Sequence, residues 1–417
     1  MIQLETRRRH VAAAVCCGLV LLGMAAQILA FVAHPVPTAR QIAATRVPSH
    51  YPADYTATDC ARAEALDGAL FWGDLAVTIT TALTLAALLL SGTTERVPCT
   101  AGSKARVWLA RILFLLAVYL TLSAIGFPFR FCRYLHYRDF GLTSLTVPGW
   151  LKVFALTLPV PLTIFVLKYL LVICTLPLCK RRWWIAAALG VFVIFDAAPE
   201  IVSRTYPADP VETLQPLVAG PHFDAMKAVL RKAGLDLPLM VVDESRRSNA
   251  ANMCLTGRQG REYVLVTDTF VRQYSPAETA LALAHELGHF QHKTKTLVTK
   301  LGGALLLSLV AFGLAFVCTG RQALPVSDAP RLIAIIMLCA LVAGQAFGPV
   351  SLALSRGEER EADSYALRLT GDGKQFQRLL LKVARNHLTP LDLPGWRYFL
   401  SASHPTFLER IAAAEGK

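Results

Sequence analysis

Long apolar stretches alternate with polar segments along most of this chain. A helix needs about 20 apolar residues to cross the hydrocarbon of a bilayer, and Val11 to Val32 meets that length. The pattern therefore predicts about seven transmembrane helices, five of them in residues 1–204 and two in residues 298–354. The six that follow the first are Leu75 to Leu90, Ile112 to Phe129, Val153 to Leu178, Trp183 to Val202, Leu301 to Val317 and Leu332 to Leu354.

The composition agrees with a membrane location. Hydrophobic residues make up 54% of the 417 residues and charged residues only 17%, which argues against a soluble enzyme of this length. The alternative for the first apolar stretch is a removable signal peptide, because Arg7, Arg8 and Arg9 precede it. The stretch is long for such a peptide and lacks an A-x-A cleavage pattern, so we expect an uncleaved helix.

Residues 205–297 have the pattern of a small α+β domain between the fifth and sixth spans. Tyr206 to Pro221 is rich in proline and predicts extended chain, whereas His222 to Gly234 has helical periodicity. Three strand-like runs then predict a short sheet, namely Leu239 to Asp243, Asn252 to Thr256 and Glu262 to Thr267. With further helices in residues 355–417, the expected fold is a mainly α, polytopic membrane protein with a small α+β domain.

The most informative motif follows this sheet, where His285, Glu286 and His289 spell H-E-x-x-H. Residues four apart lie one above the other on a helix face, so both imidazoles can reach one metal ion while Glu286 points to the same place. Ser275-Pro276-Ala277-Glu278 supplies a helix start ahead of the motif. The pattern is typical of a zinc peptidase.

A catalytic zinc ion bound by two histidines needs a third protein ligand and an open position for water. The candidate is Glu359, in a charged helix that is expected to begin at Ser355, where an apolar run ends. Asp363 lies four residues further along the same face, so one of the two acids can bind metal while the other orients a ligand histidine. Glu358 and Glu361 are expected to lie on the surface.

Two observations support Glu359 over other ligands. His292 also lies near the face of the two histidines, but Lys293 follows it and no G-x-x-H pattern completes a three-histidine site. Two predicted spans separate His289 from Glu359, and an even number of crossings returns the chain to the same side of the membrane. The two ligands can therefore meet.

Several charged residues fall within or beside the predicted spans. Such residues are costly at membrane depth unless they face a partner or water. Asp74 and Lys152 lie near span ends, where their charges can reach the membrane surface. Lys168, Asp196 and Glu200 lie deeper and indicate a hydrated interior.

The formal net charge is +13. Most of the basic residues flank the spans, where they would meet anionic headgroups, so nucleic acid is not implied as a partner. Nine of them fall at the end opposite the H-E-x-x-H motif in a seven-span arrangement, and the positive-inside rule would place the motif outside the cytoplasm. They are Arg7, Arg8, Arg9, Arg96, Lys104, Arg106, Lys180, Arg181 and Arg182.

In order and approximate spacing, these motifs resemble those of the type-one CAAX prenyl endopeptidases, integral-membrane zinc metalloproteases related to HtpX. The resemblance covers nearly the whole chain. Its N-terminal part is Gly126-Phe127-Pro128-Phe129 through Tyr137-x-x-Phe140-Gly141. Its C-terminal part is Ser245-Arg246-Arg247, Asn252 to Gly257, Val264 to Thr269, the H-E-x-x-H motif, Ser355-Arg356-x-x-Glu359-x-x-Ala362-Asp363 and Ser403-His404-Pro405-Thr406-x-x-Glu409-Arg410.

The resemblance implies one Zn²⁺ ion per chain bound by His285, His289 and Glu359, with Glu286 as the acid and base. It also implies a zincin-like catalytic domain, spans that enclose a water-filled chamber, and a catalytic end in the cytosol, at the bacterial inner membrane or the endoplasmic reticulum. Asn252 would bind the substrate backbone, and His404 and Arg410 would act at the scissile carbonyl or support the site.

The implied function is cleavage of C-terminal residues from prenylated proteins, so a peptide or protein substrate and the lipid bilayer are the expected partners. The first alternative is a quality-control protease for membrane proteins, of the HtpX type. A seven-helix transporter or receptor with a structural metal site is the alternative from another class. Glu286 argues against it, because a structural zinc site is closed by four protein ligands and needs no base.

Overall fold

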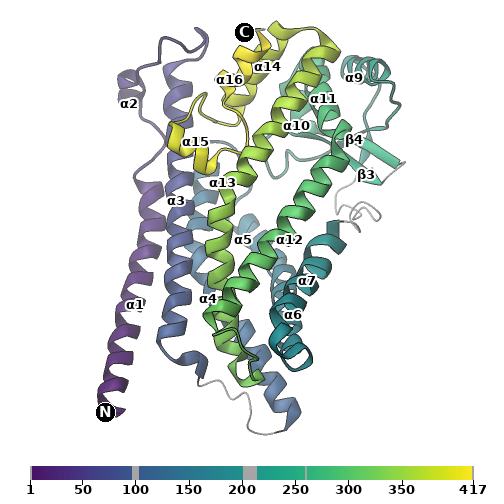
Figure 1. The fold of residues 1–417 in the computed structure, drawn as a ribbon. Coiled ribbons are helices and arrows are strands. Elements are labelled where there is room, and N and C mark those ends of the chain that lie inside the picture. Colours follow the sequence, from purple (N-terminus) through teal and green to yellow (C-terminus); the bar gives the residue numbers. More distant parts are fainter. Residues whose placement is uncertain (1, 96–102, 201–213, 259–260, 416–417) are drawn as a thin grey trace.

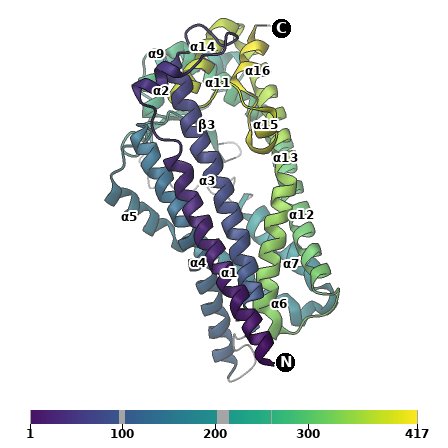
Figure 2. The same ribbon diagram turned by 90° about the vertical axis from the view of Figure 1, so that its left-hand side faces the viewer.

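The computed structural model describes residues 2–95, 103–200, 214–258 and 261–415, most of them helical (Figure 1). Long helices run side by side through much of the molecule, and smaller elements gather at one end (Figures 1 and 2). The C-terminus lies at that end and the N-terminus at the other. The long helices are α1 (Ile2–Val32), α3 (Ala57–Leu90), α4 (Lys104–Asp139), α6 (Pro159–Cys179), α12 (Lys293–Cys318) and α13 (Ala329–Thr370), and the shorter α7 (Trp183–Val191) follows α6.

The chain is an integral, multi-pass membrane protein. Within the described residues, 5 helical segments are long and apolar enough to cross a bilayer, and the apolar part of α1, Cys17–Val32, is shorter. One of the 5 segments, Val147–Glu200, contains both α6 and α7. The chain turns between these two helices at η2 (Lys180–Arg182), where Lys180 has a φ of 47°. The count of seven spans therefore remains a prediction, and the expected end of the fifth, Val202, lies outside the described residues.

The fourth predicted span is interrupted near its start. A short helix, α5 (Val147–Thr157), ends just before Pro159, and α6 begins at that proline. Proline lacks the N–H that a continuous helix would use, so a change of direction here is expected. Figure 2 shows α5 leaving the bundle at an angle from α6.

A four-stranded sheet at the other end of the molecule has the order β1-β2-β4-β3, which leaves β3 at an edge. β3 (Met253–Arg258) is antiparallel to β4 (Arg261–Thr267), and β4 is parallel to β2 (Leu239–Val242). The three predicted strands are therefore confirmed. β1 (Gln215–Pro216) comes from the stretch expected to be extended, half of which lies outside the described residues.

Helices pack around this sheet. Buried Leu283 and Leu287 on α11 (Pro276–Gln291) join Met226 and Leu230 on α9 (Pro221–Lys232) and Val264 on β4 in one hydrophobic core. α9 confirms the helix predicted for residues 222–234. The remaining elements are α2 (Ala39–Ala44), η1 (Thr93–Glu95), η3 (Phe192–Ala197), α10 (Asp268–Gln273), η4 (Val326–Asp328), α14 (Gly373–Asn386), α15 (Gly395–Ser401) and α16 (Phe407–Ala414).

The charged segment at Ser355 does not begin a new helix. It continues α13, which is 42 residues long and therefore roughly 63 Å from end to end. The expectation of a separate charged helix was wrong, because Gly357 is the only weak helix former at the change of composition and a single glycine is tolerated there. The expected boundary at residue 298 likewise falls inside α12.

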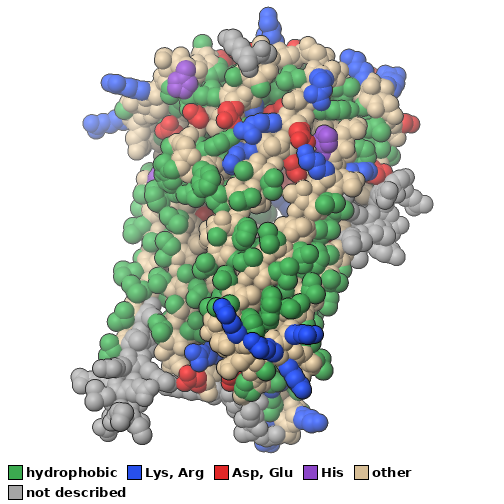
Figure 3. Space-filling model, viewed as in Figure 1, with side chains coloured by type: hydrophobic (Ala, Val, Ile, Leu, Met, Phe, Trp, Pro, Cys, Tyr) green, Lys and Arg blue, Asp and Glu red, His purple; other side chains and the backbone are tan. Residues whose placement is uncertain are grey.

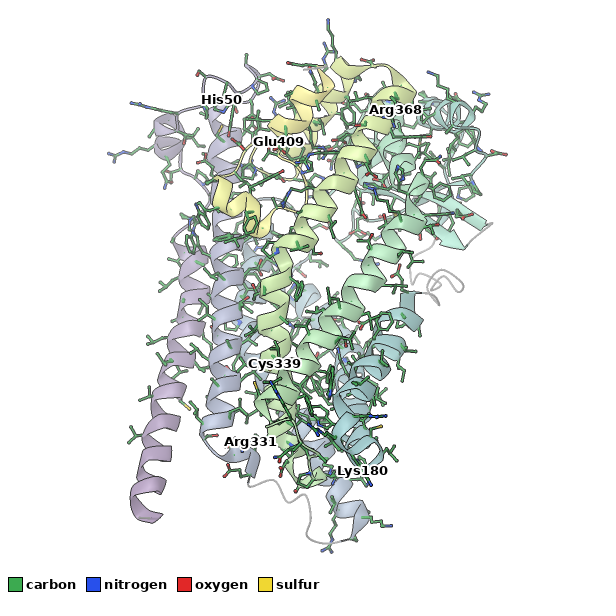
Figure 4. All side chains as sticks on the ribbon, viewed as in Figure 1. His50, Lys180, Arg331, Cys339, Arg368 and Glu409 are labelled. Atoms are coloured by element: carbon green, nitrogen blue, oxygen red, sulfur yellow. The ribbon has the colours of Figure 1, made fainter. Side chains whose placement is uncertain are left out.

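Charges lie mainly at the two ends of the molecule, with a hydrophobic belt between them (Figure 3). Lys180 and Arg331 lie at the end away from the sheet, as Figure 4 shows. Arg96 and the side chains of Arg7, Arg8 and Arg9 lie outside the described part. Of the three deeper charged residues, Asp196 and Glu200 line a cavity of about 370 Å³, and Lys168 interacts electrostatically with Asp196.

Candidate metal centre

The two histidines of the motif are presented by the last turns of α11. Ser275 caps this helix by accepting a hydrogen bond from the Glu278 N–H, and the Glu278 carboxylate accepts one from the Ser275 N–H in return. This capping box satisfies two backbone donors and fixes the start of the helix. With the helix fixed, His285 and His289 face the same way, and their Nε2 atoms are 3.2 Å apart.

Glu359 on α13 completes a cluster of three potential ligands. One of its carboxylate oxygens lies 3.4 Å from Nε2 of His285, and the other lies 3.4 Å from Nε2 of His289. Ligands arranged tetrahedrally around zinc at about 2.0–2.1 Å are separated by about 3.3 Å from one another. One ligand atom from each residue lies within 4.8 Å of the other two.

The environment of Glu359 also fits a cation. This side chain is buried, and among the described residues no group donates a well-aligned hydrogen bond to its Oε2 atom, although Nε2 of His285 lies 3.4 Å away. A buried polar atom without a partner is costly, and a bound metal ion would remove that cost. Two imidazoles and one carboxylate are a common ligand set of catalytic zinc.

Asp363 and Arg410 lie behind the cluster. Oδ1 of Asp363 lies 2.9 Å from Nδ1 of His285, the ring nitrogen that faces away from Glu359. Arg410 donates to both oxygens of Asp363 at 2.7 Å. Burial by itself lowers the pKa of His285, but the carboxylates of Asp363 and Glu359 outweigh this effect and raise that pKa to about 9. Asp363 is therefore close enough to orient His285, and Arg410 is paired with Asp363 on the far side.

Glu286 lies on the cavity side of the cluster. With His289 and part of the edge strand β3, it lines a cavity of about 680 Å³. Burial raises the pKa of Glu286, and the neighbouring His285 and His289 oppose this rise. A carboxylate whose pKa is raised toward neutrality is a better proton acceptor.

His404 approaches the cluster from the segment between α15 and α16. Its Nε2 lies 3.3 Å from Oε1 of Glu359, yet 57% of the side chain is exposed. The Arg356 guanidinium fixes this segment by donating to the carbonyl of Ala402 at 2.6 Å. His404 and Arg410 line a second cavity, of about 810 Å³, so the cluster lies between two cavities.

Asn252 lies at the start of the edge strand and is exposed. Its N–H donates to Oγ1 of Thr267 at 2.9 Å, and its Oδ1 accepts from the Met253 N–H at 2.9 Å. Leu255, Thr256 and Gly257 of β3 line the same cavity as Glu286. His292, by contrast, points to Glu361 at 3.7 Å, and Glu361 itself pairs with Lys295 at 2.7 Å.

Sequence reasoning missed the support that the membrane helices give to the edge strand. An antiparallel β-bridge joins Thr143, in the segment after α4, to Ser248, in the segment just before Asn252. Thr143 donates to the carbonyl of Arg247 at 2.7 Å, and Asn249 donates to that of Gly141 at 2.8 Å. These contacts join residues about a hundred positions apart, and no local sequence pattern predicts them.

Gly288, between Glu286 and His289, was missed as well. A Cβ atom at this position would lie 2.6 Å from the Cα of Ala362, on the α13 turn that carries Glu359 and Asp363.

We expect Gly288→Ala to push α13 away, which lowers the free energy of unfolding by about 1–3 kcal/mol through overpacking and weakens metal binding. Thermal unfolding and metal content of the purified variant measure both.

Gly357→Ala is the matched control, because within the described part of the chain no atom outside the local backbone of α13 lies within 4 Å of a Cβ at that position. It should bind metal normally and be more stable by up to about 1 kcal/mol, the helix preference of alanine over glycine. Normal metal binding and stability in Gly288→Ala would show that the close approach of the two helices is not needed.

Comparisons with known proteins agree with this arrangement. The model of peptidase family M48 matches residues 224–417. A protease HtpX homolog from Acidiphilium cryptum is 31% identical over 252 residues, which are 54% of this chain and 83% of that protein. The metalloprotease YhfN of Bacillus subtilis is 23% identical over 334 residues, 74% of each chain.

The CAAX prenyl protease 1 homolog of Oryza sativa is 28% identical over 222 residues, 49% of this chain and 52% of the rice protein. The crystal structure of S. mikatae Ste24p has the same fold, with a TM-score of 0.71 over 97% of this chain and 98% of that one, at 17% identity. These findings confirm the resemblance to the CAAX prenyl endopeptidases and to HtpX.

Proposed function

This chain is an integral membrane metalloprotease of peptidase family M48, and we propose that its metal is one zinc ion held by His285, His289 and Glu359. The observation that supports this proposal is the convergence of three ligand atoms, one from each residue, all within 4.8 Å of one another. When bound, zinc lowers the pKa of a water molecule and polarises the carbonyl of the scissile bond.

Glu286 moves the proton in this proposal. One oxygen of its carboxylate accepts a proton from the attacking water and then passes it to the nitrogen of the leaving amine. Its place in the cavity beside His289 gives it access to both groups. The residues behind the cluster have a different task, since Asp363 keeps the His285 ring in place and Arg410 keeps Asp363 in place.

His404 and the edge strand act on the substrate. Nε2 of His404 would donate to the carbonyl oxygen of the scissile bond as negative charge develops there. Among the described strands, β3 has a neighbour on one side only, and the open edge of such a strand can bind an extended peptide through main-chain hydrogen bonds. Asn252, at the start of that edge, would hold one peptide group of the substrate with its side-chain amide.

We propose prenylated proteins as the first substrate class, with cleavage near their C-terminus. The 28% identity to the CAAX prenyl protease 1 homolog of Oryza sativa favours this class. The second candidate is quality control of membrane proteins, which the 31% identity to an HtpX homolog favours. Neither candidate involves nucleic acid.

The test compares three peptides with protein purified in lipid nanodiscs. They are a farnesylated CAAX peptide, the same peptide without the lipid, and a generic unfolded peptide. We expect about one zinc ion per chain, cleavage that stops with a chelator and returns with zinc, and faster cleavage of the farnesylated peptide. Full activity in metal-free protein would overturn the zinc proposal. Equal cleavage of all three peptides would favour quality control.

A further inference from the structure

The short helix α15 exposes an apolar face next to the metal centre. Trp396, Phe399 and Leu400 are 51%, 56% and 51% exposed, although they are large and hydrophobic. They are spaced i, i+3 and i+4, so they share one face of the helix. A helix with one exposed apolar face is typical of elements that lie in the surface of a membrane.

The other face of α15 is fastened to the protein. Arg397 forms an ion pair with Asp67 of α3, and its guanidinium lies 4.6 Å from the centre of the Phe71 ring. The hydroxyl of Tyr398 bonds to Arg360 at 3.0 Å and to Glu409 at 2.9 Å. Because these contacts fix the rotation of the helix, Trp396 and Phe399 are held outward, whereas Leu400 also lines the cavity of about 810 Å³ next to His404.

Along the length of the molecule, α15 lies where the hydrocarbon of the bilayer is expected to end on the catalytic side. From Phe71 to Leu90, Asp74 is the one charged residue of α3 and most of the others are apolar, and this stretch is roughly 30 Å long at 1.5 Å per residue. The hydrocarbon of a bilayer has about the same thickness. Phe71 and Trp72 thus mark its boundary at the catalytic end, and the ring of Trp396 lies 5.4 Å from Phe71 and 6.4 Å from Trp72.

The apolar face of α15 also continues a lipid-facing surface. Trp72, Leu75 and Ile79 on α3 are exposed, although all three are large apolar side chains of a membrane-spanning helix. Figures 1 and 2 show α15 beside the upper part of α13, and in Figure 3 hydrophobic side chains continue up to this level. Tryptophan is enriched at this level of membrane proteins because its ring is apolar and its N–H can reach water.

We propose that α15 is an in-plane membrane anchor whose partner is the boundary between lipid headgroups and acyl chains. His404 follows this helix closely in the chain, and Arg356 joins the two by donating to the carbonyls of Tyr398 and Ala402 at 3.3 and 2.6 Å. The anchor therefore fixes the height of the His404 segment above the membrane surface. It is a positioning element, and its contact with lipid does not depend on the proposed substrate.

Quenching of tryptophan fluorescence tests this contact directly. Trp396 would be kept as the single tryptophan, and the protein would be placed in vesicles of phosphatidylcholine with bromine at the headgroup end of the acyl chain. We expect a large loss of emission relative to unbrominated vesicles, and a smaller loss when the bromine is near the methyl end. Five residues are changed to Phe in this variant, namely Trp72, Trp108, Trp150, Trp183 and Trp184.

Two further variants keep the test decisive. If the single-tryptophan protein does not fold, the signal of Trp396 is taken as the difference in emission between the native chain and Trp396→Phe. This difference is then compared between brominated and unbrominated vesicles. The control adds Arg368→Trp to a tryptophan-free chain, because Arg368 is exposed at the catalytic end, away from the belt (Figure 4). Its emission should respond to acrylamide in water and not to bromine.

Two results would overturn the proposal. Quenching of Trp396 by acrylamide alone would place α15 in water, and protection from both quenchers would mean that another protein surface, such as a second copy of this chain, covers it. Either result would leave the zinc proposal intact, because the measurement does not involve peptide cleavage.

Discussion

Glu286→Gln abolishes most peptide cleavage while the protein still folds and binds its metal. Glutamine has nearly the shape of glutamate but cannot accept the proton of the attacking water. A positioned base contributes about 10²–10⁴-fold to a rate, so we expect kcat to fall by that factor. Steady-state kinetics on the best peptide of the three, together with metal content and thermal unfolding, measure the effect.

Glu358→Gln is the matched control for this variant. Glu358 lines the same cavity as Glu286 but is not one of the three clustered ligand residues. We expect its substitution to change kcat little. Near-normal activity of Glu286→Gln would mean that Glu286 is not the base, whereas an equal loss in both variants would mean that the cavity needs negative charge in general.

Removal of the third ligand has the other large effect. Glu359→Ala leaves two histidines as ligands. Loss of a residue that only supports a ligand lowers metal affinity by up to about 100-fold, so we expect loss of the ligand itself to lower zinc affinity by more than that. Activity should fall with it, and excess zinc should restore part of the metal content. A competition titration with a chromogenic chelator gives the affinity.

His404→Ala separates metal binding from catalysis, because His404 lies beside the same carboxylate at 3.3 Å. It should retain zinc and lose about 3 kcal/mol of transition-state stabilisation, so that kcat and kcat/KM fall together. Loss of zinc in this variant would place His404 among the metal ligands. Full zinc occupancy in Glu359→Ala would mean that another residue, with Glu358 the first to test, is the third ligand.

Local patterns predicted the elements that carry the candidate site. The capping sequence from Ser275 to Glu278 fixed the start of α11, and the four-residue spacing of His285 and His289 gave their common face. The even number of predicted spans between His289 and Glu359 placed both residues on the same side of the membrane, so that α13 could meet α11. Each of these inferences depends on residues that are close in sequence or on the simple rule that a membrane helix changes side.

Contacts between distant segments could not be predicted in the same way. The need for glycine at Gly288 arises only because α13 passes within contact distance, and the ion pair of Asp363 with Arg410 depends on where the C-terminal segment folds back. The continuity of α13 was missed for another reason. The change from apolar to charged residues at Ser355 marks where the helix leaves the membrane, and helix propensity is unaffected by that change.

The arrangement of α12 and α13 has a consequence for biosynthesis. His285 and His289 precede this helical hairpin, and Glu359 comes near its end, so a growing chain has only two of the three ligand residues until both helices have been made and inserted. The catalytic site can then assemble only in a chain that is already in its membrane. In a newly made chain, the order of the elements thus delays the last of the three proposed ligand residues until α13 has been made.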